Sequence, residues 1–379
     1  MGSWSKGYPR HHSGRVSCET VVMTRILFVA FVLLLAACSG GSADSETSAG
    51  ESQSSSESPV ESASESPQAE ALETTTSTTA PSDTTPPTSA APASTPATTA
   101  PTLQDPVQLA ANGRAVPVAP TSAEDAAAKY TAVYAGLRAE GSTQEDWADL
   151  GHSEQVIVRT MIRNPEWEAD FLAALDPELA QIAGLHLDAR RELGLLHAGG
   201  PAPSERVPAW TVIDPVPLDQ LVAWYQSASE QTGIDWRILA GINLVETGMG
   251  RIDGVSTAGA QGPMQFLPTT WEEVSQGGDI RDPDDAIHGA ARYLVQRGGL
   301  EDIQEGLWGY NNSFNYGNAV LAYAEIIELD ERNLRGFYNW EVYVGSSEGI
   351  LWLPVGYEEP EPRQADDYVA NNPWVTTIG

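Results

Sequence analysis

The chain has 379 residues and a net charge of −32, with 52 Asp and Glu against 20 Lys and Arg. This acidic balance argues against nucleic acid as a partner, because there is no basic surface to neutralise phosphates. The two cysteines, Cys18 and Cys38, both precede the region that we expect to fold, which excludes a disulfide framework, a cysteine-ligated zinc site and a cysteine nucleophile. The six histidines show no paired or HExxH spacing, so we expect no metal and no cofactor.

The first predicted element is a signal peptide over residues 1–38. Residues 26–37 form an uninterrupted apolar stretch behind Arg25. The stretch is too short for a membrane-spanning helix, which needs about 20 residues. It therefore predicts the apolar part of an export signal, and Met23 is an alternative start of the chain.

This stretch ends in the sequence LAAC, at Cys38. The pattern resembles the signal of bacterial lipoproteins, in which the cysteine thiol receives a diacylglyceryl group before cleavage. We therefore expect Cys38 to be lipidated and to hold the protein at the outer face of the cell membrane, in an extracytoplasmic location. The alternative is an ordinary secreted protein with a chance cysteine at this position.

Residues 39–105 consist almost entirely of Ser, Thr, Ala, Pro, Glu and Asp. With few large apolar side chains, such a segment cannot offset the entropy cost of ordering its backbone. It predicts a disordered stalk, of a composition that suits O-glycosylation, which could carry a folded domain away from a membrane. A passive low-complexity spacer would have the same composition.

Helical patterns follow the stalk, so the predicted fold class is mainly α. We expect an N-terminal helical lobe over residues 106–200, with a helix capped by Ser122 and three more at 155–162, 165–175 and 177–195. Trp147 and Trp167 are predicted core residues of this lobe. The sequence Gly-Gly-Pro at 199–201 predicts its boundary.

A second helical domain is predicted over residues 201–335. Its helices are expected at 217–231, after a cap at Asp235, after Asp284 and Asp285, and at 316–329. The remaining 336–379 form an aromatic-rich tail, in which FYNWEVYVGSSEGILWLPVGY predicts a β-hairpin with a glycine-containing turn.

Chemistry-bearing residues concentrate in the second domain. With Asp235 as the cap, Leu239, Ile242, Asn243 and Glu246 share one face of a short helix. Glu246 then lies on a largely apolar stripe, in the last turn before a glycine, and no cation lies one turn away. Burial and the negative end of the helix dipole both disfavour the carboxylate, and a raised pKa suits a general acid. A solvated carboxylate at a fraying helix end is the alternative.

Two further stretches combine aromatic rings with amides. AGAQGPMQFLPTTW, at 258–271, has small residues that permit close backbone approach and offers the amide of Gln265. WGYNNS, at 308–313, precedes Tyr316 and the last long helix. Such segments suit a sugar-binding groove, although a tight structural turn over a core explains them equally well.

Together and in this order, the three stretches resemble the motifs of the soluble lytic transglycosylase family. INLVETGMGR matches its Glu-Ser-Gly motif with Thr247 for serine, GAQGPMQFLPTTW matches Gly-Leu-Met-Gln with Pro263 for leucine, and GYNNSFNYGNAV matches Ala-Tyr-Asn with Gly309 for alanine. The resemblance covers roughly residues 208–335. It is strongest to actinobacterial members, which share the preceding segment PAWTVIDPVP and a tail that ends in LPVGY.

The resemblance implies a lysozyme-like helical catalytic domain that acts on peptidoglycan glycan strands. It implies that Glu246 is the catalytic acid and that Gln265, Tyr310 and Asn311 line the groove, with Tyr316 as a further substrate-binding residue. In the reaction it implies, the acid protonates the oxygen between N-acetylmuramic acid and N-acetylglucosamine. The same group then deprotonates the muramoyl 6-hydroxyl, which closes a 1,6-anhydro ring.

Two alternatives stay open. One is a muramidase that activates water with Asp253 or Asp279 as the base. The other is a wall-binding lipoprotein that has lost turnover. The acidic cluster at 279–285 is expected to supply a helix cap rather than a calcium loop, because its spacing misses the EF-hand pattern. Because the charge is acidic, we expect recognition to use stacking and hydrogen bonds to sugars. The sequence predicts no particular protein partner.

Overall fold

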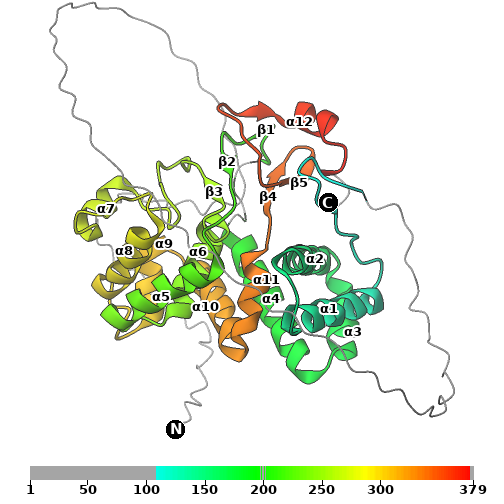
Figure 1. The fold of residues 1–379 in the computed structure, drawn as a ribbon, viewed down its shortest axis with the longest axis horizontal. Helices are drawn as coiled ribbons and strands as arrows, with labels where there is room; N and C mark the ends of the chain where they lie inside the picture. The colour runs from blue at the N-terminus through cyan, green and yellow to red at the C-terminus, as the bar shows by residue number, and fades with distance from the viewer. Residues whose placement is uncertain (1–107, 197, 199, 201, 376–379) are drawn as a thin grey trace, which may run out of the picture. The chain divides into compact units, whose positions relative to one another are not determined.

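The computed structural model describes residues 108–375, apart from residues 197, 199 and 201. The predicted signal peptide, Cys38 and the predicted stalk lie outside these residues. The described part consists mainly of helices, with a few short antiparallel strands (Figure 1). This confirms the predicted fold class, a helical protein with a hairpin in its tail.

The N-terminal lobe contains helices at all the predicted places. They are α1 (Ala123–Arg138), α2 (Gln144–Arg163), a 3₁₀ turn (Pro165–Trp167), α3 (Glu168–Ala174) and α4 (Pro177–Leu196). Ser122 caps α1 as expected, but α2 begins well before the predicted residue 155. Thr143 and Asp146 form a capping box there, in which each side chain accepts a hydrogen bond from the other's backbone N–H. The predicted core residues Trp147 and Trp167 are half-buried at the edge of the core.

The second helical group contains α5 (Leu218–Thr232), α6 (Trp236–Thr247), α7 (Pro268–Val274), α8 (Pro283–Gln296), α9 (Ile303–Asn311), α10 (Phe314–Leu329), a 3₁₀ turn (Glu331–Asn333) and α11 (Leu334–Tyr338). Asp235 caps α6 as predicted. The cap of α8 is Asp282, whose side chain accepts from the N–H groups of Asp284 and Asp285, so the predicted caps lie in the first turn instead. The sequence pattern predicts neither α7 nor α9.

The strands form three antiparallel pairs among the described residues. They are β1 (Arg206–Val207) with β6 (Arg363–Gln364), β2 (Thr211–Val212) with β3 (Ile252–Asp253), and β4 (Val342–Ser346) with β5 (Gly349–Leu353). The last pair is the predicted hairpin, in which Val344 lies opposite Leu351. Its first predicted residues, Phe337 and Tyr338, belong to α11 instead. A short helix, α12 (Ala365–Asn371), follows β6.

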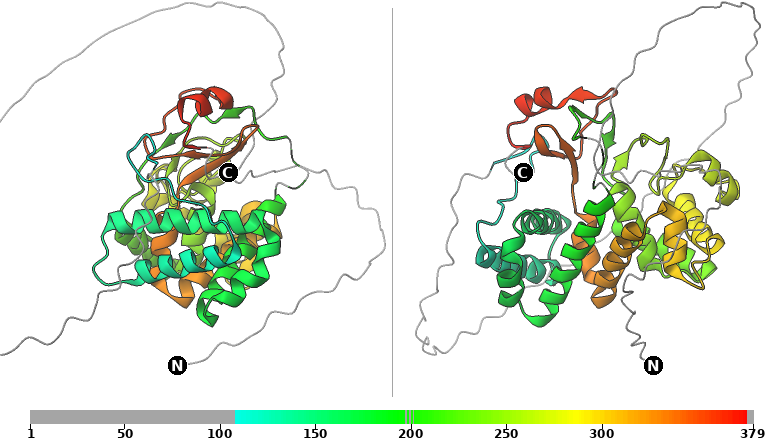
Figure 2. Two further views of the ribbon diagram at one scale, coloured as in Figure 1. Left: turned by 90° about the vertical axis from the view of Figure 1, so that its right-hand side faces the viewer. Right: turned by 180° about the vertical axis from the view of Figure 1, so that it is seen from behind.

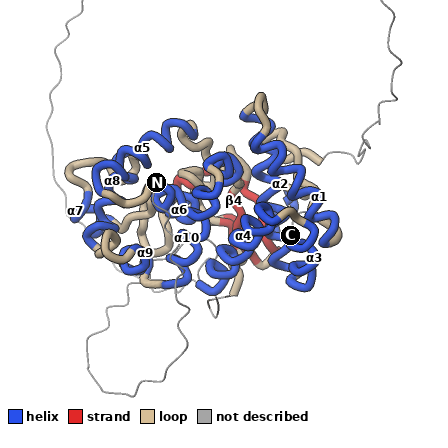
Figure 3. Tube along the Cα trace, turned by 90° about the horizontal axis from the view of Figure 1, so that it is seen from below, coloured by secondary structure: helices blue, strands red, loops and turns tan. Residues whose placement is uncertain are grey.

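One hydrophobic core connects the two helical groups. Helix α10 lies between α4 on one side and α6 on the other, and its buried face includes Val320 and Tyr323 (Figures 1 and 3). Gly241 of α6 lies against α10 so closely that a Cβ there would be 2.9 Å from the Val320 carbonyl oxygen. Glycine at this position therefore permits the contact between α6 and α10. The predicted domain boundaries at residues 200 and 335 stay predictions.

A second, smaller core lies under the strands and the tail. The side chains of Trp352, Leu351 and Leu353 in β5 are fully buried, and Val156 of α2 belongs to the same cluster. The hairpin and α12 therefore lie over one end of the helices (Figure 2). Within residues 108–375, no helix combines the length and apolar character that crossing a membrane requires.

Candidate active site

Glu246 is placed by a short helix that is buried on nearly all sides. Every residue of α6 except Arg237 is buried, and Glu246 in its last turn is only 4% exposed. The helix ends at Gly248, which adopts a left-handed conformation (φ 62°) and donates its N–H to the carbonyl oxygen of Leu244. The predicted face is buried, because Leu239, Ile242 and Asn243 are also buried.

The carboxyl of Glu246 has one hydrogen-bond partner among the described residues. The Tyr316 hydroxyl, from the first turn of α10, donates to Glu246 Oε1 at 2.7 Å. The Tyr310 ring stacks on the Tyr316 ring at 6.1 Å between centroids, and the Tyr310 hydroxyl donates to the carbonyl oxygen of Met264 at 2.8 Å. The two tyrosines thus connect the carboxyl to the loop before α7.

Burial raises the pKa of Glu246 to about 8. The hydrogen bond from Tyr316 favours the ionised form and opposes this rise, but burial is the larger effect. The carboxyl is therefore mostly protonated at neutral pH. A protonated carboxyl beside a cavity can act as a general acid.

The loop at 258–266 is held against α6 by hydrogen bonds to Pro263. The Thr247 hydroxyl and the Asn243 amide both donate to the Pro263 carbonyl oxygen, at 2.6 and 2.8 Å. Gly262 lies so close to the backbone of Ile280 that a Cβ would be 1.9 Å from its carbonyl oxygen, and its φ is +73°. Only glycine fits this position, and Thr247 supplies the hydroxyl that the resemblance expects from serine.

Gln265 lies in the same loop with a strained backbone, at φ 49°. Its amide nitrogen donates to the Gly262 carbonyl oxygen at 3.0 Å, whereas its buried Oε1 has no partner among the described residues. A buried acceptor without a donor is costly, so a ligand that offers an N–H or O–H to this atom would be stabilised.

Two adjoining cavities contain the predicted binding residues. The smaller, of about 300 Å³, is lined by Glu246, Gln265, Tyr310 and Asn311 together with Ala258, Ala260 and Leu267. The larger, of about 1440 Å³, also reaches Gln265 and Tyr310 and is bordered by Tyr293 and by Trp308, which is 42% exposed. The structure therefore brings Glu246, Gln265, Tyr310 and Asn311 to one place, with Tyr316 buried behind the carboxyl.

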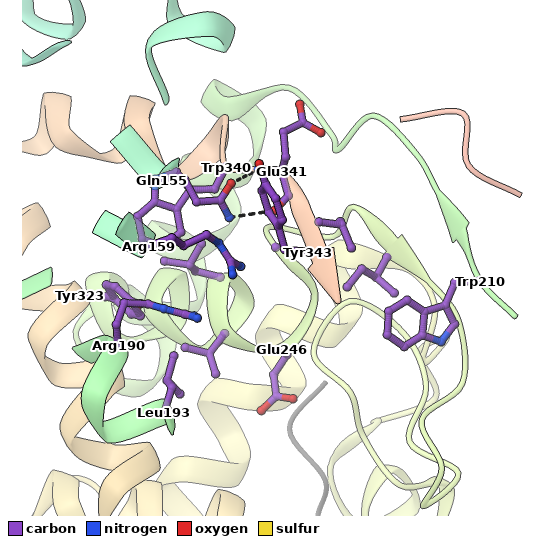
Figure 4. A pocket seen from close by; sticks show the side chains of 15 residues that line it. Gln155, Arg159, Arg190, Leu193, Trp210, Glu246, Tyr323, Trp340, Glu341 and Tyr343 are labelled. Carbon is purple, nitrogen blue, oxygen red and sulfur yellow. Dashed lines mark hydrogen bonds between the residues drawn. The ribbon is translucent and has the colours of Figure 1, made fainter. Parts of the chain in front are cut away.

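A third cavity, of about 550 Å³, reaches Glu246 from the N-terminal lobe (Figure 4). Its lining includes Arg159 of α2 and Arg190 of α4, which belong to none of the three sequence motifs. In the sequence of each helix, the arginine has no feature that distinguishes it from the other polar residues of that helix. Their convergence depends on how α2 and α4 pack, so no local sequence signal could have indicated it.

The two aspartates considered as bases for a muramidase, Asp253 and Asp279, lie away from the cavities that Glu246 lines. The Asp253 side chain is 59% exposed and lies 3.7 Å from Arg281, and Asp279 is an exposed residue whose carboxylate accepts the Arg281 N–H. Neither aspartate lines a cavity that Glu246 lines. Among residues 108–375, no group of His, Cys, Asp and Glu side chains has an arrangement that could hold a metal ion.

Comparison with protein-family models matches residues 224–334 to the transglycosylase SLT domain. A search of curated proteins and a search of solved structures each found no match. The matched segment contains Glu246, Gln265, Tyr310, Asn311 and Tyr316, whereas the helices of the N-terminal lobe and the hairpin lie outside it. Domains of this kind act on peptidoglycan outside the cytoplasm. Residues 224–334 of the chain are thus a domain of the soluble lytic transglycosylase family, with a lysozyme-like helical fold.

Proposed function

We propose that the protein cleaves the β-1,4 bond between N-acetylmuramic acid and N-acetylglucosamine and leaves 1,6-anhydromuramic acid ends. The observation that supports this proposal most is the buried carboxyl of Glu246, which is mostly protonated at neutral pH and is the only carboxyl among the described residues that line the smaller cavity, beside aromatic and amide side chains. Transglycosylation needs one group that first gives and then takes a proton, which suits this arrangement.

In the proposed reaction, protonated Glu246 donates its proton to the glycosidic oxygen as the bond from that oxygen to the muramoyl C1 breaks. The N-acetylglucosamine portion leaves as an alcohol. The Glu246 carboxylate then accepts the proton of the muramoyl 6-hydroxyl while O6 bonds to C1. The carboxyl returns to its protonated form, and no water is consumed.

The neighbouring side chains fit roles in this reaction. Tyr316 donates to the carboxylate between the two proton transfers, when Glu246 carries a charge in a buried place. The free Oε1 of Gln265 accepts a hydrogen bond from a substrate acetamide or hydroxyl. Tyr310 and Asn311 line the groove beside the carboxyl, and exposed Trp308 offers a ring on which a sugar can stack.

A muramidase would need a second carboxylate to activate water. The two candidates that the sequence offered, Asp253 and Asp279, line neither cavity that Glu246 lines, and the Glu341 carboxylate, which lies at the cavity of Figure 4, accepts from Arg114 and Trp352. No observation in the described residues favours hydrolysis over ring closure. We also propose that lipidated Cys38 holds the enzyme at the outer face of the membrane, next to its substrate.

The proposal is tested by measuring the rate at which purified peptidoglycan is solubilised. Glu246→Gln removes the proton and keeps the size of the side chain, so we expect the rate to fall by about 10⁴-fold or more, because one group performs both transfers. Asp253→Asn and Asp279→Asn are matched controls that each remove one carboxylate nearby, and both should keep near-native rates. Near-native activity of Glu246→Gln would refute the assignment, and a large loss in either control would favour hydrolysis.

A further inference from the structure

The cavity in Figure 4 is formed mostly by residues outside the matched family domain. Arg159, Arg190 and Tyr343 line it from α2, α4 and β4, and Glu246 lines it from α6. Figure 4 shows the two guanidinium groups pointing into the same space, on the side of the cavity away from Trp210. In a chain with a net charge of −32, two arginines converging here need an explanation.

Arg159 is a buried cation without an acidic partner among the described residues. Its side chain is buried, its guanidinium lies over the Tyr343 ring at 4.2 Å from the centroid, and its Nε has no hydrogen-bond partner. Burial and the like charge of Arg190 lower the pKa of Arg159 to about 9. An unpaired charge in this position is costly, and an anion in the cavity would relieve the cost.

None of the acidic side chains near the cavity pairs with either arginine among the described residues. The Glu341 carboxylate accepts from Arg114 and from Trp352 Nε1, and in Figure 4 it points away from the two arginines. The Glu154 carboxylate accepts from Trp340 Nε1 and lies beside His186. Glu246 is mostly neutral at pH 7. Arg190 likewise forms no ion pair among the residues that the structure describes, whereas the next residue, Arg191, pairs with Glu168 and Asp188.

We propose that Arg159 and Arg190 form a binding site for a carboxylate of the peptidoglycan strand, beside the bond that is cleaved. This inference rests on the proposed function. The planar guanidinium matches a carboxylate through paired hydrogen bonds, and the two groups approach one space from different helices.

The chemistry of the substrate indicates which sugar this site recognises. The muramoyl sugar has a lactyl ether that ends in a carboxylate or is joined to a stem peptide with carboxylates of its own, whereas N-acetylglucosamine is neutral. Because the cavity reaches Glu246, the carboxylate would belong to the muramoyl residue at the reacting bond. The arginines would then place this sugar correctly and distinguish peptidoglycan from neutral glycans of the same backbone.

The test measures binding of soluble glycan strands to the full chain with Glu246→Gln, which prevents cleavage. Three strand types are compared: strands with stem peptides, peptide-free strands with free lactyl carboxylates, and peptide-free strands whose carboxylates are methyl-esterified. Arg159→Gln and Arg190→Gln are added singly. The matched control is Arg191→Gln, one residue further on α4, which is paired with Glu168 and Asp188.

We expect Arg159→Gln and Arg190→Gln each to weaken binding of an anionic strand by about 10- to 100-fold, which is typical of the loss of a charge-assisted hydrogen bond. Binding of the esterified strand should not change, and Arg191→Gln should have no effect on any strand. A loss that requires the stem peptide assigns the carboxylate to that peptide, and a loss with peptide-free strands assigns it to the lactyl group.

The inference is wrong if the arginine replacements weaken all three strands equally, which would indicate a structural role, or if they weaken none. Cleavage by the wild-type chain is measured in parallel. If the wild type cleaves peptidoglycan but the arginine replacements have no effect, only this inference is wrong. If the charge dependence is found but the wild type does not cleave, the carboxylate site stands and the proposed reaction is wrong.

Discussion

Replacing Glu246 with Gln should stabilise the folded protein increasingly as the pH rises. The pKa of Glu246 is raised from its usual value of 4.5 to about 8 in the folded state by burial. Between these two pH values the unfolded chain ionises this group while the folded chain keeps it protonated, so ionisation favours unfolding. Glutamine has the same size, can still accept the hydrogen bond from Tyr316, and does not titrate.

The size of this effect follows from the two pKa values. The wild type should lose about 1 kcal/mol of stability at pH 5, about 3 kcal/mol at pH 7 and about 5 kcal/mol above pH 9, relative to a chain in which this group does not titrate. For a folded region of this size, 1 kcal/mol corresponds to about 2–4 °C in melting temperature. The advantage of Glu246→Gln should therefore grow by about 5–10 °C between pH 5 and pH 7.

The assay is thermal unfolding of both proteins across this pH range, in which Asp253→Asn serves as a control with an exposed carboxylate. The difference between Glu246→Gln and the wild type cancels the titration of all other groups. A difference that stays constant from pH 5 to pH 9 would show that burial does not hold this carboxyl in its protonated form. The reasoning that makes Glu246 a general acid would then fail.

Two further predictions concern its hydrogen-bond partner and the anchor. Tyr316→Phe removes the hydrogen-bond donor that favours ionised Glu246, so the pKa of Glu246 should rise. The alkaline decline in cleavage should then shift to higher pH, and the maximal rate should fall. A shift of this decline to lower pH would contradict the role assigned to Tyr316. Cys38→Ala should move the protein from the membrane fraction to the soluble fraction of the producing cells, and identical fractionation of variant and wild type would rule out lipidation at this position.

Local sequence signals predicted the helix that contains the acid. Asp235 at its start, Gly248 at its end and the spacing of Leu239 and Ile242 all agree, so the face on which Glu246 lies could be inferred. Helix α9 could not be inferred in the same way. It contains Gly306 and Gly309, which have low helix propensity, and Gly306 packs so closely on Gly299 that a Cβ there would be 2.8 Å from the Gly299 Cα.

Only part of the site could be predicted from the sequence, because some of its contacts join helices that are far apart in the chain. Glu246, Gln265 and Tyr310 belong to motifs whose order along the chain is recognisable. The contact between Tyr316 and Glu246 joins α10 to α6, and the arginine pair joins α2 to α4, so both depend on tertiary packing. The expectation that recognition uses stacking and hydrogen bonds to sugars came from the net charge, which does not show where individual cations lie.

The most direct test of the proposed reaction is the mass of the muropeptides that the wild-type chain releases from purified peptidoglycan. Ring closure by the muramoyl 6-hydroxyl predicts products with 1,6-anhydromuramic ends, each lighter by one water than the corresponding hydrolysis product and resistant to borohydride reduction. Products with reducible muramic acid ends would contradict the account and would identify the enzyme as a muramidase.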